Sequence, residues 1–189
     1  MGQTCPEAVP DIDLGAEINH LVDGGKLIFA AASNTGNNGN RSWPASHRGV
    51  FCIHATDEGG DKVSRLNPPP SPVLDNFATL GHDIESFWDA KHRSVSGTSF
   101  ASPIATAIAA NVLEFVGREI GDETAEFFKR YGTMRELFRK RMASSIDGYD
   151  YLRPWNKGLW DGRCKTDICQ DLKSISMRGF DRFDSSERA

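Results

Sequence analysis

The feature that most constrains the fold is the segment from Ser99 to Val116, which is apolar on nearly every side. Its large apolar residues are interleaved with alanines, and Pro103 falls in the first turn, where its missing N–H costs nothing. A helix that is apolar all round runs through the middle of a structure rather than along its surface. The sequence therefore predicts a fold built around one central buried helix.

Two short apolar runs precede this helix, at residues 26–32 and 49–55. Runs without polar alternation are typical of parallel strands that are covered on both faces. Asp13 can cap a helix over residues 14–22, and shorter strands are expected at 84–87 and 93–96. This order of elements predicts an α/β fold with a parallel sheet.

The pattern divides the chain into four parts. We expect a loop at residues 1–13, the α/β body at 14–118 and a C-terminal helical extension at 119–160. From residue 161 to 189 the chain is charged, rich in serine and poor in apolar residues, which predicts a poorly ordered tail.

Charge and composition exclude some classes of partner. The net charge of −4 argues against nucleic acid, because phosphate binding needs a concentrated basic surface. We expect no segment to cross a bilayer, since no run of consecutive apolar residues is long enough. The first residues lack the pattern of a secretory signal, so an intracellular location is favoured while the compartment itself stays unknown.

Neither the cysteines nor the acidic residues identify a metal site. Cys164 and Cys169 could pair or hold a metal, but with no second pair and no nearby histidine, free thiols are the better interpretation. Acidic loops such as Asp57-Glu58 could bind calcium, although too few carboxylates cluster to assign a site. We therefore expect no cofactor, with calcium left open.

Ser99 is the main candidate for chemistry because it stands in the first turn of the buried helix, directly after a glycine turn. Unpaired backbone N–H groups at a helix N-terminus can stabilise the anion that forms when a serine attacks a carbonyl. The alternative is an ordinary capped core helix, since serine and threonine begin many helices.

The segment Gly-Thr-Ser-Phe-Ala-Ser-Pro at 97–103 resembles the nucleophile motif Gly-Thr-Ser-x-Ala-x-Pro of the subtilisin-like serine peptidases. Residues 30–36 resemble the strand and following asparagine of that family, and Trp43-Pro44-Ala45 resembles its aromatic-proline turn. Residues 79–81 are similar to the stretch before its last strands, with Thr-Leu-Gly in place of the usual Ala-Pro-Gly. Three motifs in the right order make the resemblance specific, from about residue 14 to 115.

The resemblance implies a serine endopeptidase with a polypeptide substrate and a doubly wound parallel sheet. Ser99 would be the nucleophile and Asn34 the side-chain donor to the oxyanion, although most loop asparagines merely bond nearby backbone. The wall of the pocket for the substrate side chain before the scissile bond would be formed by Ala31, Ala32 and Ser33.

The catalytic Asp and His of the family are missing from this sequence. Both precede the oxyanion asparagine in the family, in Asp-Thr/Ser-Gly and His-Gly-Thr segments, but Asp11-Ile12-Asp13 and His20-Leu21-Val22 match neither. The remaining histidines are expected to be surface or packing residues. A serine without a base is a weak nucleophile, so the chain alone is expected to be inactive.

The fold is accordingly expected to be an incomplete doubly wound sheet with an unpaired apolar edge. Two hypotheses remain open. The chain is either a portion of a peptidase domain completed by an N-terminal segment or a complementary chain, or a non-catalytic interaction module derived from a subtilase. Residues 147–155 also resemble the ends of intracellular fungal members.

Overall fold

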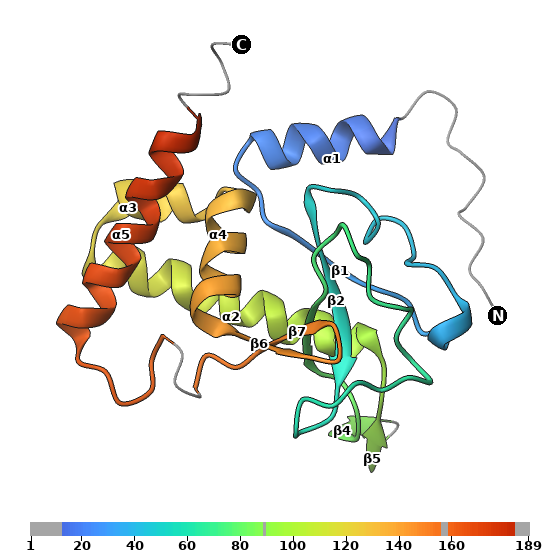
Figure 1. The fold of residues 1–189 in the computed structure, drawn as a ribbon. Helices are drawn as coiled ribbons and strands as arrows, with labels where there is room; N and C mark the ends of the chain where they lie inside the picture. The colour runs from blue at the N-terminus through green and yellow to red at the C-terminus, as the bar shows by residue number, and fades with distance from the viewer. Residues whose placement is uncertain (1–12, 89, 156–158, 184–189) are drawn as a thin grey trace.

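The computed structural model describes residues 13–88, 90–155 and 159–183 (Figure 1). The first part of the chain gives α1 (Leu14–Asp23), β1 (Ile28–Ala31), the 3-10 turn η1 (Gly36–Asn38), β2 (Val50–Thr56), β3 (Phe77–Leu80), β4 (Ile84–Trp88) and β5 (Lys91–Val95). The second part gives α2 (Thr98–Glu119), α3 (Asp122–Phe128), α4 (Tyr131–Leu137), the π-helical turn η2 (Phe138–Met142), β6 (Ala143–Ile146), β7 (Tyr149–Leu152) and α5 (Lys165–Phe183). The predicted loop at residues 1–13 lies almost wholly outside the described residues.

A mostly parallel sheet forms the body and confirms the predicted fold class. Its strand order is β1-β2-β3-β7-β6, and only the β6–β7 pair is antiparallel. The strand β2 is buried along its whole length, as its unbroken apolar run predicts. The expected short strands at 84–87 and 93–96 form a separate antiparallel hairpin, β4–β5, which projects from the body (Figure 1).

The helix α2 is the central element that its sequence predicts. Its buried residues include Ala101, Ala105, Val112 and Val116, and it packs on β1, β2 and β3. By length and composition alone α2 could also cross a bilayer, contrary to our expectation that no segment could. Its packing on the sheet accounts for the apolar composition, because α2 must bury surface on several sides.

The remaining helices complete the core around α2. Both α3 and α5 contact α2, and α4 packs on α5 (Figure 1). Phe51 on β2 is the centre of an aromatic cluster, with ring centroids 4.8 Å from Phe29, 5.9 Å from Phe77 and 5.6 Å from Phe138. Such ring pairs stabilise a core beyond the area they bury.

The predicted disorder after residue 161 is wrong for the helical part of that segment. Residues 165–183 form α5, in which Ile168, Leu172 and Ile175 are buried against the core. Their spacing of four and three positions places them on one helix face. The high charge and serine content concealed this narrow apolar stripe.

Loops cover the face of β2 that points away from α2. Pro68 O, in the segment between β2 and β3, accepts a hydrogen bond from Tyr149 OH at 2.8 Å, and the Tyr149 ring lies edge-on to His54 with centroids 4.9 Å apart. Ala45, from the segment between β1 and β2, packs on Ala32 and Cys52. This face is therefore closed by ordered loop residues.

Candidate active site

The carboxyl end of β1 meets the beginning of α2 through the side chain of Asn34. Asn34 Oδ1 accepts a hydrogen bond from Thr98 N at 2.8 Å, and Thr98 Oγ1 lies 3.0 Å from the same oxygen and 3.2 Å from Ser33 O. Thr98 is buried, so the contact is held from one side by the protein interior. The bond to Thr98 N satisfies one of the free N–H groups at the start of α2.

This contact fixes which way the Asn34 amide points. Because Oδ1 faces Thr98, the Nδ2 group is turned elsewhere, and it has no hydrogen-bond partner among the described residues. Nδ2 lies close to Gly97, where a Cβ would stand 3.3 Å from it. The glycine thus allows the amide to lie directly beside the first turn of α2.

Ser99 follows Thr98 in this turn and is exposed. Phe100 N and Ala101 N donate to Gly97 O at 3.0 and 3.4 Å, and Thr98 N donates to Asn34. Within the part of the chain that the structure describes, neither the hydroxyl nor the N–H of Ser99 has a hydrogen-bond partner. The structure therefore brings Ser99 and Asn34, far apart in sequence, to one junction with three free donors.

The three predicted pocket residues differ in their surroundings. Ala32 is fully buried and its methyl group packs on Ala45 and Cys52, whereas Ala31 and Ser33 are half-buried. Ser33 has a backbone φ of 143°, which L-residues rarely adopt. Strain of this kind is found where the surroundings force a backbone turn, commonly at functional sites. Here it redirects the chain from β1 so that Asn34 meets α2.

The histidines lie elsewhere, and among the described residues none forms a hydrogen bond with Ser99. The His82 imidazole lies between Arg65 and Asp83, and the His92 ring packs edge-on against Phe87 with centroids 5.5 Å apart. The others are His20 in α1, His47 before β2 and His54 within β2.

His54 is a buried base that no sequence motif singles out. Its Nδ1 lies 3.1 Å from Phe77 O and donates to it, while Nε2 is buried without a partner in the described residues. Burial, together with the nearby charge of Arg41, lowers the pKa of His54 to about 3. His54 is therefore neutral at physiological pH, inside the body.

The described residues contain no cluster of three or more His, Cys, Asp or Glu side chains that could hold a metal. The carboxylate of Asp57 serves its own turn, accepting from Gly59 N and Asp61 N at 2.9 Å each. Cys164 and Cys169 are free thiols, and Cys52 is a buried one. Burial raises the pKa of Cys52 to about 11, so it is an unreactive thiol.

No protein-family model matches the chain. Similar curated proteins are subtilisin-like protease het-Q2 of Podospora anserina, 34% identical over 98 residues, and proteinase R of Parengyodontium album, 30% identical over 119 residues. These matches cover 49% and 62% of this chain. They span only 27% and 30% of the two proteins, so the chain corresponds to less than a third of such relatives.

Solved structures with the same fold include the prenylagaramide maturation protease PagA and the PatG macrocyclase in complex with peptide. PagA matches 84% of this chain and 55% of its own, with a TM-score of 0.61 and 20% identity. PatG matches 84% of this chain and 47% of its own, with a TM-score of 0.59 and 16% identity. Over about half of its length this chain is similar in sequence to subtilisin-like proteases, and over most of its length it has the fold of about half of their protease domain.

Proposed function

We propose that this chain is the nucleophile-bearing portion of a serine endopeptidase domain. The observation that carries the proposal is the bond from Thr98 N to Asn34 Oδ1 at 2.8 Å. That bond turns the Asn34 Nδ2 donor toward Gly97 and the first turn of α2, where Ser99 is exposed. A fixed donor beside an exposed serine is the arrangement that acyl transfer requires.

The chemistry follows from these groups. Ser99 Oγ forms a bond to the carbonyl carbon of a peptide while its proton passes to a base, and the carbonyl electron pair moves onto the oxygen. The free N–H of Ser99 and Asn34 Nδ2 donate to that oxyanion. When the intermediate collapses, the C–N bond breaks, the base returns the proton to the amine, and water later releases the acyl group by the same route.

In this proposal the base comes from outside the described residues. Of the strands described, β1 pairs with β2 alone, which leaves one side of β1 at the edge of the sheet. Its residues 28–31 are only half-buried. A further strand carrying the Asp and His of the family would pair here and cover this apolar edge. That segment would be another part of the same protein or a complementary chain.

A fluorophosphonate probe, which reacts with activated serines, tests this proposal. We expect the chain alone to label no more than its Ser99→Ala variant. Fused or co-expressed with the portion of the Podospora anserina relative that precedes its matched region, the chain should label strongly, and Ser99→Ala should abolish the label. The loss for this variant should be about a million-fold in turnover, as for the nucleophile of subtilisin.

Two outcomes would contradict the proposal. Ser99-dependent labelling of the chain alone would mean that a base lies within it, and labelling that survives Ser99→Ala would mean that another group reacts. The open edge of β1 also favours the second candidate, a non-catalytic module that binds an extended polypeptide strand. If the completed assembly forms a stable complex but does not label, this second function is supported.

A further inference from the structure

A cavity of about 320 Å³ lies at the end of the sheet opposite to Ser99. Its lining includes Val50, the first residue of β2, and Asp75, which shortly precedes β3. Asn34, by contrast, follows the carboxyl end of β1, which runs parallel to β2. The cavity is therefore separate from the junction with Ser99, and the proposed peptidase chemistry does not use it.

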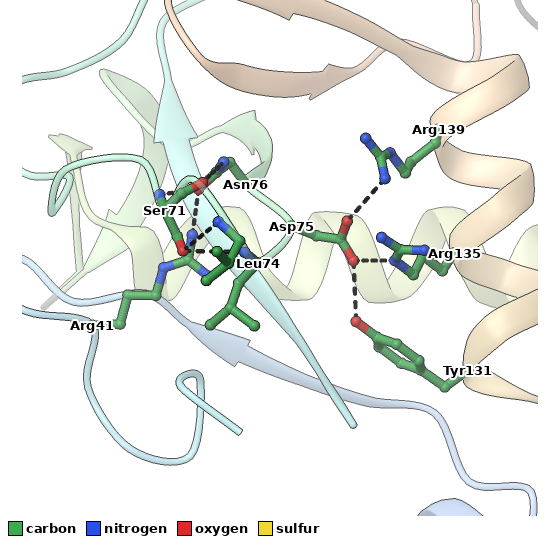
Figure 2. Close-up of polar contacts among 9 residues, drawn as sticks. Arg41, Ser71, Leu74, Asp75, Asn76, Tyr131, Arg135 and Arg139 are labelled. Carbon is green, nitrogen blue, oxygen red and sulfur yellow. Dashed lines mark hydrogen bonds and ion pairs between the residues drawn. The ribbon is translucent and has the colours of Figure 1, made fainter. Parts of the chain in front are cut away.

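The charge of the cavity wall is predominantly positive. Arg41, Arg48 and Arg135 line it, with Asp75 as the single carboxylate of the described lining. This carboxylate is only 9% exposed. Both of its oxygens already contact donor side chains of the protein (Figure 2). Its Oδ2 accepts from Arg135 Nε and from Tyr131 OH at 3.2 Å, and its Oδ1 lies 3.7 Å from Arg139 Nη1. Asp75 therefore neutralises the α4 side of the cavity and leaves the other side positive.

On that other side, Arg41 forms no ion pair with any residue that the structure describes. Its Nη2 donates to the neutral amide oxygen of Asn76, while its Nε is buried and has no partner in the described ranges (Figure 2). Arg48, which is exposed, forms no ion pair with any described residue. A partly buried guanidinium without a negative partner is unfavourable, because its lost hydration is not compensated.

The charge of Arg41 also acts on the interior. Burial has the largest effect on the pKa values of His54 and Cys52, and the charge of Arg41 has the second largest. The charge of Arg41 lowers both pKa values. Cys52 lines the cavity as well. An anion beside Arg41 would thus neutralise a charge that buried neighbours experience directly.

We propose that this cavity binds a small molecule carrying an oxyanion, a phosphate or carboxylate group, which Arg41 and Arg48 recognise. Guanidinium groups match both oxyanions through paired N–H donors. The volume lies at the lower end of the range for ligand pockets, about 300–1,000 Å³, which suits a small metabolite. Ala45, Val73 and Leu74 add apolar surface for the rest of such a ligand.

Thermal unfolding and isothermal titration with inorganic phosphate test the proposal on the whole chain, at an ionic strength held constant with sodium chloride. A parallel titration with acetate distinguishes a phosphate site from a carboxylate site. A ligand that binds only the native state raises the melting temperature with its concentration. We expect either phosphate or acetate to raise the melting temperature more than chloride does at the same ionic strength.

Three variants locate the effect. Arg48→Gln should weaken binding about tenfold or more, the usual effect of losing a charged hydrogen bond, and Arg41→Gln should do the same. Arg93→Gln, which removes an exposed arginine on the β4–β5 hairpin, should bind like wild type. If Arg41→Gln unfolds because the contact with Asn76 is lost, Arg48→Gln decides the matter.

The proposal is overturned if neither anion stabilises the chain more than chloride. Equal stabilisation of wild type and Arg48→Gln would overturn it too, because the anion would then bind elsewhere. None of these measurements depends on the activity of Ser99, so failure here leaves the proposed function untouched.

Discussion

The two ends of the central sheet use their polar groups in opposite ways. At the carboxyl end, the hydroxyl and N–H of Ser99 and the Nδ2 of Asn34 lie at an exposed helix start, without partners among the described residues. At the amino end, the Asp75 carboxylate is almost fully buried and contacts three donor side chains. Saturated polar groups stabilise a fold, whereas fixed and unsatisfied donors are available to stabilise a charge that develops on a substrate.

The Asn34 side chain combines both roles, because its Oδ1 is bonded within the fold while its Nδ2 is free to donate to a substrate. Substituting Asn34 should therefore give the largest effect on turnover among the changes considered below. In the completed domain, Asn34→Ala should lower turnover about 10²–10³-fold, because an oxyanion donor is lost. In the chain alone it should lower the free energy of unfolding by about 1 kcal/mol, because Thr98 N loses its hydrogen-bond acceptor. Rates of peptide hydrolysis and urea unfolding measure the two effects.

Asn34→Asp is the matched control. It keeps an oxygen that accepts from Thr98 N, so the stability of the chain should stay close to wild type, and a carboxylate at a helix start is favourable. It removes the Nδ2 donor, so turnover should fall at least as far as for Asn34→Ala. Full turnover in Asn34→Asp would show that this amide does not serve the oxyanion.

Asp75 tests the other end of the comparison. Asp75→Asn should lower the free energy of unfolding by about 2–3 kcal/mol, because Arg135 and Arg139 lose a nearly buried negative partner. The effect is smaller than for a fully buried pair, since the side chains of Arg135 and Arg139 are 40% and 51% exposed and water can solvate them. Fluorophosphonate labelling of the completed domain should not change.

The exposed ion pair between Lys62 and Asp147, with atoms 3.6 Å apart, supplies the control for Asp75. Asp147→Asn should cost less than about 1 kcal/mol in urea unfolding, because water screens the pair. The φ of 52° at this position is one that asparagine tolerates. If Asp75→Asn and Asp147→Asn lower the free energy of unfolding equally, the buried network around Asp75 stabilises the fold no more than a surface ion pair does.

The two ends also differ in how far the sequence could predict them. The junction at Ser99 is encoded in two short runs of consecutive residues, 30–36 and 97–103, so local patterns are enough to find it. The Asp75 network joins a loop to α4 across 56 and 60 positions, to Tyr131 and Arg135. No local pattern marks such a contact, because only the folded sheet brings the two segments together.

The same distinction holds for the elements of the fold. The buried helix α2 and the strand β2 are unbroken apolar runs, so the sequence predicts them within a few residues. The strand β3, with sequence Phe-Ala-Thr-Leu, is too short to show a period, and pairing with β2 and β7 makes it a strand. In α5, charges outnumber a narrow apolar stripe that matters only once α4 is there to cover it.

His54 lies on β2 between the two ends, and it should make stability depend on pH. Its folded pKa of about 3 is below the ordinary value of 6.5, so between these values the unfolded chain binds a proton that the folded chain does not. Stability is therefore fully present above about pH 6.5 and falls as the pH falls toward 3. From pH 7 to pH 5 the expected loss through His54 is about 2 kcal/mol.

Urea unfolding of wild type and His54→Gln at several pH values measures this loss. The glutamine amide can still donate to Phe77 O, which His54 Nδ1 contacts at 3.1 Å, but it cannot take up a proton. The difference in unfolding free energy between the two proteins should therefore change by about 2 kcal/mol between pH 7 and pH 5, in favour of the variant at low pH. Parallel curves would mean that the ring reaches water in solution, and that the loop over this face of β2 opens more readily than the contact of Pro68 O with Tyr149 OH indicates.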